Sequence, residues 1–290
     1  CISLDGGDEN INCGDASDLN VTTGSFTLIG WINNNNIGNY DVIVQKGNAG
    51  HGTSPGYRLR WESDNKLMFI CTQSSSYAED NVLTADALAQ DTWYQVAITR
   101  NAGLLSIYID GALNNSKSTA ITGTLTNSEH FVLGYDKYND SAYFNGQMAD
   151  WRFFNTALSA ANVIIPTKND ASGGFVSQSN LKLSLSLSEG AGVVCYDGSG
   201  NGNHGTFTNA DSSGDWLTGQ TGCPQLVEGY NRPMLFDGSN DYVYFGSYAN
   251  VAGASYGTVS AWIYLTGAAN DHATIYTCQT GANWAGMRLV

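Results

Sequence analysis

The stretch GQMADWRFFNTALS, residues 146–159, carries the strongest structural signal in this chain of 290 residues. Its segment ADWRFFN, residues 149–155, is short and rich in aromatic residues, which favours a β-strand. The residues SAANVII that follow, 159–165, predict a short helix that begins at Ser159 and ends before Pro166. The stretch therefore predicts a strand that leads into a brief helical segment.

Outward from this stretch, short segments of β-branched and aromatic residues recur along the chain. Polar linkers separate them, and Gly103 in the linker RNAGLL predicts a hairpin. Many strands with scarcely a helix predict an all-β sandwich or jelly roll. The expected strands are FTLIGWI (26–32), DVIVQK (41–46), YRLRW (57–61), KLMFICTQ (66–73), WYQVAITR (93–100), LLSIYIDG (104–111), HFVLGYD (130–136) and ADWRFFN (149–155).

One phrase of the sequence occurs twice. The residues LDGGDENINCG…GSFTLIGWI (4–32) align with FDGSNDYVYFG…YGTVSAWIY (236–264), and YRLRW aligns with GMRLV at 286–290. The nearly constant spacing predicts one module used twice. In each copy the Asp-Gly pair predicts a tight turn, and the equivalent Trp31 and Trp262 are expected to fill the core.

Charge and composition exclude several classes of partner. The chain has 12 basic and 26 acidic residues, and its net charge of −14 opposes broad contact with nucleic acid or with anionic membrane surfaces. No stretch reaches the roughly 18 apolar residues of a membrane span. The low content of charged residues (13%) and the 34 glycines suit an uncharged polar surface with many turns, which favours an extracellular, cell-surface or virion-surface protein.

Taken together, these motifs resemble the successive signatures of a laminin-G-like (LamG) jelly roll of the concanavalin A-like lectin/glucanase superfamily. The resemblance implies an all-β, concanavalin A-like jelly-roll sandwich in tandem copies. Residues 185–207, LSLSEGAGVVCYDGSGNGNHGTF, resemble the strand and polar loop that open such a domain. The most specific part is the ending G-x-(I/M)-x-D-x-R-x-(Y/F)-N-x-A-L-S, matched by Gly146, Met148, Asp150, Arg152, Phe154, Asn155, Ala157, Leu158 and Ser159.

The family pattern also implies domain boundaries. The first jelly roll is expected over residues 1–170 without its opening strand, and the second over 178–290 without its C-terminal half. We therefore expect a window of a longer polypeptide with tandem modules. The alternative is that neighbouring subunits supply the missing strands by strand addition.

The cysteines leave two interpretations open. None of the six forms a CxxC or Cys/His metal spacing, and none recurs at the same place in both copies, which excludes a shared disulfide framework. They are either free thiols packed as small apolar side chains, or they include a disulfide between Cys195 and Cys223, which flank one polar loop. Such a disulfide would favour an extracellular compartment.

Catalysis is not expected. The resemblance calls for a test, because the glucanases of this superfamily place E-x-D-x-x-E on one strand, so that the carboxylates reach the cleft. The nearest match, WESDNKL, has Glu62 and Asp64, but Leu67 stands where the second glutamate belongs. The sequence also lacks a G-x-S-x-G elbow and a phosphate-binding loop. Glycoside hydrolase activity is therefore a remote alternative.

Calcium is the cofactor that the sequence allows, because it binds carboxylate, amide and backbone oxygens. The resemblance extends to the pentraxins, and it implies a site between Asn39 and Asp41 on one segment and a second acidic segment, which departs from the pentraxin pattern by its shorter length and by Lys137. The candidate ligands in that second segment are Asp136, Asn139 and Asp140. In the alternative interpretation these residues only turn the chain.

A weaker calcium candidate is the loop YDGSGNGNHG, residues 196–205. It places Asp197, Asn201 and Asn203 at alternating offsets, but it lacks the final glutamate of an EF-hand. Its four glycines favour the simpler interpretation of a polar turn.

Sugar binding would use aromatic rings together with Asn and Asp side chains on loops at one end of the sandwich. The best candidates are Tyr135 and Tyr138, which flank Asp136, and Tyr40 is a further one. Any of these can instead be a half-buried strand residue. The full set of candidate tyrosines is Tyr40, Tyr57, Tyr77, Tyr135, Tyr138 and Tyr143.

Two classes of function follow. The first is a non-catalytic carbohydrate-binding or adhesive module of a longer extracellular or surface protein, with a glycan as its partner. The second is a structural, decorating or fibre module of a virion or extracellular assembly, in which the jelly roll contacts neighbouring protein subunits.

Overall fold

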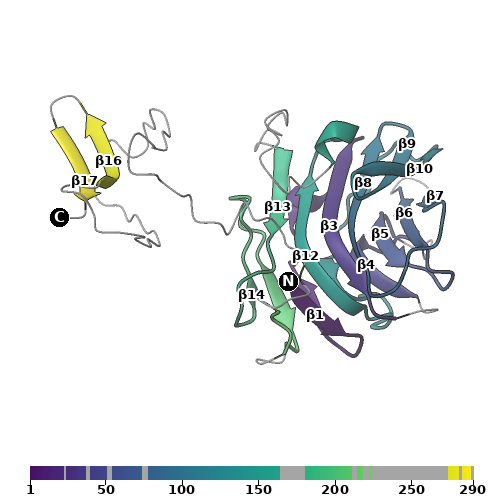
Figure 1. Cartoon of the computed structure of the whole chain (residues 1–290). Coiled ribbons are helices and arrows are strands. Elements are labelled where there is room, and N and C mark those ends of the chain that lie inside the picture. Colours follow the sequence, from purple (N-terminus) through teal and green to yellow (C-terminus); the bar gives the residue numbers. More distant parts are fainter. Residues whose placement is uncertain are drawn as a thin grey trace. The chain divides into compact units, whose positions relative to one another are not determined.

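A computed structural model describes residues 1–22, 24–36, 40–50, 54–73, 78–163, 180–210, 214–217 and 223, and the strand backbones of 274–280 and 283–288. The chain divides into two compact units, Cys1–Tyr230 and Asn231–Val290. In the first unit, two antiparallel sheets form a sandwich around one large apolar core (Figure 1). In the described part of this unit, the helical structure is limited to short 3-10 turns, so the prediction of an all-β sandwich is confirmed.

The first sheet follows the order β1-β12-β3-β8-β9-β10, with β13 also paired to β12. Its central strands are the apolar segments that the sequence predicts. Arg152 donates hydrogen bonds of 2.8 and 2.7 Å to the Asp150 carboxylate, so the D-x-R pair of the signature is an ion pair within β12. The strands are β1 (Ile2–Asp5), β12 (Asn145–Phe154), β3 (Phe26–Asn34), β8 (Trp93–Asn101), β9 (Leu104–Ile109), β10 (Ala112–Ser118) and β13 (Leu181–Leu185).

The second sheet follows the order β14-β15-β2-β11-β4-β5-β6-β7. Its last strand β7, like β10 of the first sheet, was not predicted, because EDNVL and ALNNSKS are mostly polar; both strands lie at sheet edges, where polar residues are common. The strands are β14 (Val194–Cys195), β15 (Gly205–Thr208), β2 (Asn10–Asn12), β11 (Phe131–Leu133), β4 (Asp41–Gly47), β5 (Gly56–Trp61), β6 (Leu67–Thr72) and β7 (Glu79–Leu83).

The core differs from the expectation in its tryptophans. Phe26, Leu28 and Ile32 of β3 point into the core, so alternation turns Trp31 to the outer face of the first sheet. There Trp31 packs against a second, smaller apolar cluster. The described tryptophans that belong to the main core are Trp61, Trp151 and Trp216.

The expected helix at 159–165 is a single 3-10 turn, Ala160–Asn162, and Ser159 makes no side-chain capping bond. Leu158 and Val163 on either side of this turn are buried in the cluster on the outer face of the first sheet. These two anchors hold the segment against the sheet. Residues 164 and 165 lie outside the described part of the chain.

Residues 181–208, expected to belong to a second jelly roll, lie in the first sandwich. Strand β13 pairs with β12, and β15 pairs with β2. The compact unit therefore extends to Tyr230, and the boundary expected between residues 170 and 178 does not coincide with it. The physical reason is that the apolar side chains of this segment complete the core of the first copy.

The second unit contains one described hairpin, β16 (Thr274–Thr280) with β17 (Asn283–Arg288), paired antiparallel. The repeated phrase 236–264 and its Trp262 lie outside the described residues. A second jelly roll in this region therefore stays a prediction. In the described part of the chain, no helix is long and apolar enough to span a membrane.

A disulfide joins Cys1 to Cys223, with the two Cα atoms 5.7 Å apart. Residues 214–217 bring the two cysteines together, because Ser3 N donates to Asp215 O at 2.7 Å and Leu217 N donates to Cys1 O at 2.9 Å. The alternative prediction of a disulfide between Cys195 and Cys223 is therefore wrong, because Cys223 is bonded to Cys1. Cys195, in β14, is a free buried thiol. Cys13, which follows β2, and Cys71, in β6, are free buried thiols as well.

Glu9, at this edge of the sandwich, is expected to make the stability of the fold depend on pH. Its carboxylate accepts a hydrogen bond of 2.5 Å from Asp5 N. Burial raises the pKa of Glu9 to about 7; the hydrogen bond from Asp5 opposes this, and the charge of Asp215 adds to it. A raised carboxyl pKa stabilises the fold at low pH, and that stability is lost as the pH rises from about 4.5 through about 7.

We therefore expect the free energy of unfolding to fall by about 1–3 kcal/mol between pH 5 and pH 8, and Glu9→Gln to remove most of this fall. Urea unfolding of both proteins at the two pH values measures it. A variant that loses as much stability as the wild type over this range would show that Glu9 is not the group responsible.

Candidate functional site

A small hollow opens on the second sheet beside Tyr138. Its volume is about 20 Å³, room for about one water molecule. The lining comes from the end of β4, from the loop that precedes β11 and from the loop that follows it. It therefore gathers amide, imidazole, carboxylate, ammonium and phenol groups from three separate segments: Gln45, Gly47, Asn48, Glu129, His130, Lys137 and Tyr138.

A buried lysine fixes the loop on one side of the hollow. Lys46 Nζ donates to the Glu129 backbone carbonyl at 2.6 Å and to Asp15 Oδ1 at 3.0 Å. Burial lowers the pKa of Lys46, and the bond to Asp15 opposes the shift. Asn127 adds a further anchor, because its Oδ1 accepts from Glu129 N at 2.9 Å. Lys46 and Asn127 thus fix both backbone polar groups of Glu129, in the loop that precedes β11.

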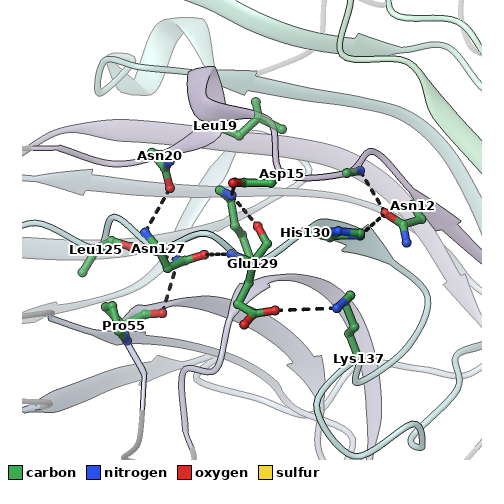
Figure 2. A network of polar contacts seen from close by, with 12 residues as sticks. Asn12, Asp15, Leu19, Asn20, Pro55, Leu125, Asn127, Glu129, His130 and Lys137 are labelled. Atoms are coloured by element: carbon green, nitrogen blue, oxygen red, sulfur yellow. Dashed lines mark hydrogen bonds and ion pairs between the residues drawn. The ribbon is translucent and has the colours of Figure 1, made fainter.

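The rim of the hollow carries further polar contacts. His130 Nδ1 lies 2.9 Å from Asn12 Oδ1, and Lys137 Nζ lies 3.6 Å from Glu129 Oε2 (Figure 2). Gln45 Oε1 accepts from Lys137 N at 3.2 Å. The loops that carry Glu129 and Lys137 are therefore tied both to each other and to β4.

The three tyrosines proposed for sugar binding differ in exposure. Tyr138 is 60% exposed, and its backbone N–H donates to Asp136 Oδ1 at 3.0 Å. Tyr135 is only 9% exposed and stacks on Tyr143, with ring centroids 5.4 Å apart. Tyr40 is exposed and packs on Arg60, and it does not line the hollow. Of these three tyrosines, Tyr138 is the one that is exposed and lines the hollow, so it is the remaining candidate for contact with a sugar. Tyr77, another candidate, lies outside the described residues.

Asp136 is a buried carboxylate surrounded by donors. Its Oδ2 lies 3.2 Å from Arg58 Nη1 and accepts from Asn139 Nδ2 at 3.1 Å. The guanidinium thus supplies the positive charge that a cation would bring. Asp140 accepts a hydrogen bond of 2.6 Å from Tyr143 Oη, which raises the pKa of Tyr143 to about 12.

Asp41 lies elsewhere. Asp41 on β4 lies opposite the core residue Trp61 on β5. Asp136 instead contacts Arg58, which precedes Trp61 by three residues on β5. Because side chains alternate along a strand, Trp61 and Arg58 point to opposite faces of the sheet. A calcium ion shared by Asp41 and Asp136 stays a prediction. Asn39, the remaining member of this predicted site, lies outside the described residues.

Asp41 is buried. Burial raises its pKa to about 6, and hydrogen bonds from Asn145 and Asn36 oppose the shift. Within the described ranges, no group of three or more His, Cys, Asp or Glu side chains is placed to hold a metal ion. Calcium also binds amide and backbone oxygens, so the calcium site expected at these residues stays a prediction.

The Asp197 loop is built around its own carboxylate. Asp197 Oδ1 accepts from Ser184 N and Ser199 N, both at 2.9 Å. Its Oδ2 accepts from Asn203 N at 2.9 Å and from Ser199 Oγ at 2.8 Å. The side-chain amides of Asn201 and Asn203 donate to the backbone carbonyls of the first two residues of β13, Leu181 and Lys182. Donors therefore surround both carboxylate oxygens, as a structural turn requires.

The nearest hydrolase motif is not assembled. Glu62 is paired with Arg60, and Leu67 is buried in the core at the position of the missing glutamate. The lining residues Gln45, Glu129 and His130 could not be recognised from the sequence, because the hollow brings together three segments that are distant in sequence. No local pattern marks such a convergence.

Comparison with known proteins gives a family match and several structural likenesses. The description "Concanavalin A-like lectin/glucanases superfamily" (Laminin_G_3) matches residues 5–164, which is 160 of the 290 residues. No curated protein matches the chain.

Among solved structures, this chain is similar to a "putative carbohydrate binding protein" from Bacteroides ovatus, with 19% identity and a TM-score of 0.53 over 74% of this chain and 61% of the other. It therefore spans less than two thirds of that protein. A pentraxin from Limulus polyphemus has 14% identity and a TM-score of 0.41 over 55% and 77% of the two chains. The CBM40 of a Ruminococcus gnavus sialidase, bound to sialyllactose, has 11% identity and a TM-score of 0.42 over 48% and 80%.

Proposed function

Because this chain belongs to the Laminin_G_3 family of the concanavalin A-like lectin/glucanases superfamily, we propose that it is a non-catalytic module that binds carbohydrate beside Tyr138. The observation that carries the proposal is that Tyr138 is 60% exposed and lines a small hollow together with Glu129 and Lys137. An aromatic face offers apolar contact to a sugar ring, and the nearby polar groups can bind its hydroxyls.

The residues that line the hollow include both donors and acceptors of hydrogen bonds. Glu129 accepts, Lys137 donates, and His130 can do either according to its tautomer. Its volume of about 20 Å³ does not enclose a sugar ring. Binding would therefore take place on the surface, with one hydroxyl in the hollow and the ring against Tyr138. A shallow site of this kind binds weakly by itself and gains strength through repeated modules.

The wider context is also part of the proposal. The disulfide Cys1–Cys223 is typical of an oxidising compartment, which supports an extracellular or surface location. The repeated phrases support tandem modules within a longer protein. The Bacteroides ovatus protein shares the fold, and the carbohydrate role that its name carries is proposed here for this chain on the evidence of the hollow.

Replacement of Tyr138 by alanine is expected to weaken glycan binding about tenfold, which corresponds to about 1.4 kcal/mol. The matched control is Tyr196→Ala, because Tyr196 is 61% exposed and packs on His204, outside the lining of the hollow. A glycan array identifies the ligand for the wild type, and calorimetry then compares the three proteins.

Two results would count against this site. Equal loss in both variants would mean that the effect is not specific to the hollow. Unchanged affinity in Tyr138→Ala would place the binding surface elsewhere on the sandwich.

A further inference from the structure

Two segments from distant parts of the sequence share one edge of β12. Strand β1 pairs with its first half, where Ile2 faces Met148, and β13 pairs with its second half, where Leu185 faces Trp151. Both are antiparallel to β12, so they run in the same direction, one after the other. Asp150 N donates to Ser186 O at 3.2 Å, which continues the line of β13 toward Cys1.

The same segment also completes the second sheet. Strand β15 pairs with β2, with Thr206 facing Asn12, and β14 lies beyond it. Residues 181–208 thus provide the outer strands on one side of both sheets (Figure 1). Their apolar side chains are buried in the main core: Leu183, Leu185, Leu187, Cys195 and Phe207.

The repeated phrase of the sequence gives residues 181–208 a second possible pairing partner. In space this segment precedes the strand ISLD of the first phrase (residues 2–5), but along the chain it precedes the second phrase, which begins with MLFDGSN at 234–240. One segment therefore has two equivalent phrases that it can precede. When it serves the second phrase, the edge of β12 and β2 is left for a segment from elsewhere.

We propose that residues 181–208 form an exchangeable segment, which a second copy of this chain can supply to the edge of β12 and β2. The observed pairing is the arrangement within one chain, and exchange replaces it by the same pairing between two chains. Only residues 164–179 connect the segment to Val163, so the chain can leave its own edge without breaking any strand of residues 1–163.

The disulfide reports which chain supplied the segment. Residues 214–217 pair with β1 next to the segment, and Cys223 reaches Cys1 of the sandwich on which they dock. After exchange, Cys223 of one copy therefore lies beside Cys1 of the other. Thiol–disulfide exchange with oxidised glutathione, which takes up the two electrons, then links the copies covalently.

The test uses two full-length chains of different tag size, Cys1→Ser and Cys223→Ser, both carrying Cys278→Ser. Neither can form the disulfide within itself. They are unfolded together, refolded in a glutathione buffer and separated on a non-reducing gel. We expect a linked heterodimer, whose yield rises with protein concentration and is lost on reduction. In a mixture of Cys223→Ser chains of the two tag sizes, no such band is expected.

A second variant tests the strand pairing itself. Leu183→Asp in the Cys1→Ser chain puts a charge into the core position of the segment and is expected to abolish the heterodimer, whereas the exposed substitution Asp86→Ala in the same chain is expected to leave it unchanged. The proposal is overturned if refolded mixtures give no heterodimer at any concentration while circular dichroism shows folded β-structure. A heterodimer that persists with Leu183→Asp would overturn it equally.

Discussion

Replacement of Asp136 by alanine is expected to lower the free energy of unfolding by about 3–5 kcal/mol, because it leaves the Arg58 guanidinium buried without this carboxylate. Both side chains are almost fully inaccessible to solvent, and their charged atoms lie 3.2 Å apart. Burial lowers the pKa of Arg58, nearby Arg60 adds to that shift, and the Asp136 charge opposes it. Urea unfolding at pH 7 measures the loss.

Two further variants separate charge from packing at this pair. Asp136→Asn keeps an oxygen for the Tyr138 N–H but removes the charge, and we expect an intermediate loss. The double variant Arg58→Met with Asp136→Leu leaves no charge unpaired, and we expect it to be closer to the wild type than Asp136→Ala. A loss below about 1 kcal/mol in Asp136→Ala would contradict the importance of the pair.

Replacement of Asp197 by alanine is expected to cost about 2–4 kcal/mol, since four donors lose their acceptor at once. Three of these donors are backbone N–H groups that connect the loop to itself and to β13. The matched control is Asp86→Ala at an exposed position, with an expected change within about 0.5 kcal/mol. Equal effects in the two variants would show that the loop does not depend on its carboxylate.

The same two aspartates decide the calcium hypothesis. Arg58 already neutralises Asp136, and hydrogen-bond donors surround Asp197, so we expect saturating calcium to leave the melting temperature of the wild type unchanged. Thermal unfolding in calcium and in EDTA is the measurement. A rise with calcium that disappears in either alanine variant would restore that aspartate as a ligand.

The strands were predictable because their signal is local. Residues 26–32 show the aromatic and β-branched character of β3, and the same holds for β4, β5 and β8. The face of the sheet on which a side chain lies was harder to predict from the sequence. Trp31 has the composition of a core residue, yet alternation from Phe26 turns it to the outer face of the sheet.

Pairing between distant segments could not be predicted. Nothing in residues 181–208 shows that their partners are β12 and β2, because sheet register depends on which edge is free. The position of Cys223 beside Cys1 follows from that pairing and was missed with it. At the candidate site, the aromatic type of Tyr138 was a usable signal, whereas its exposure and its neighbours Glu129 and His130 depend on the fold.

The bond between Cys1 and Cys223 has a mechanical consequence. It connects two points that are 222 residues apart in the sequence. Tension applied to the backbone at these two residues passes through the sulfur atoms and bypasses every strand between them. Without the bond, the same stretch could lengthen to roughly 700 Å when pulled straight. In an oxidising environment the first unit therefore behaves as an inextensible link.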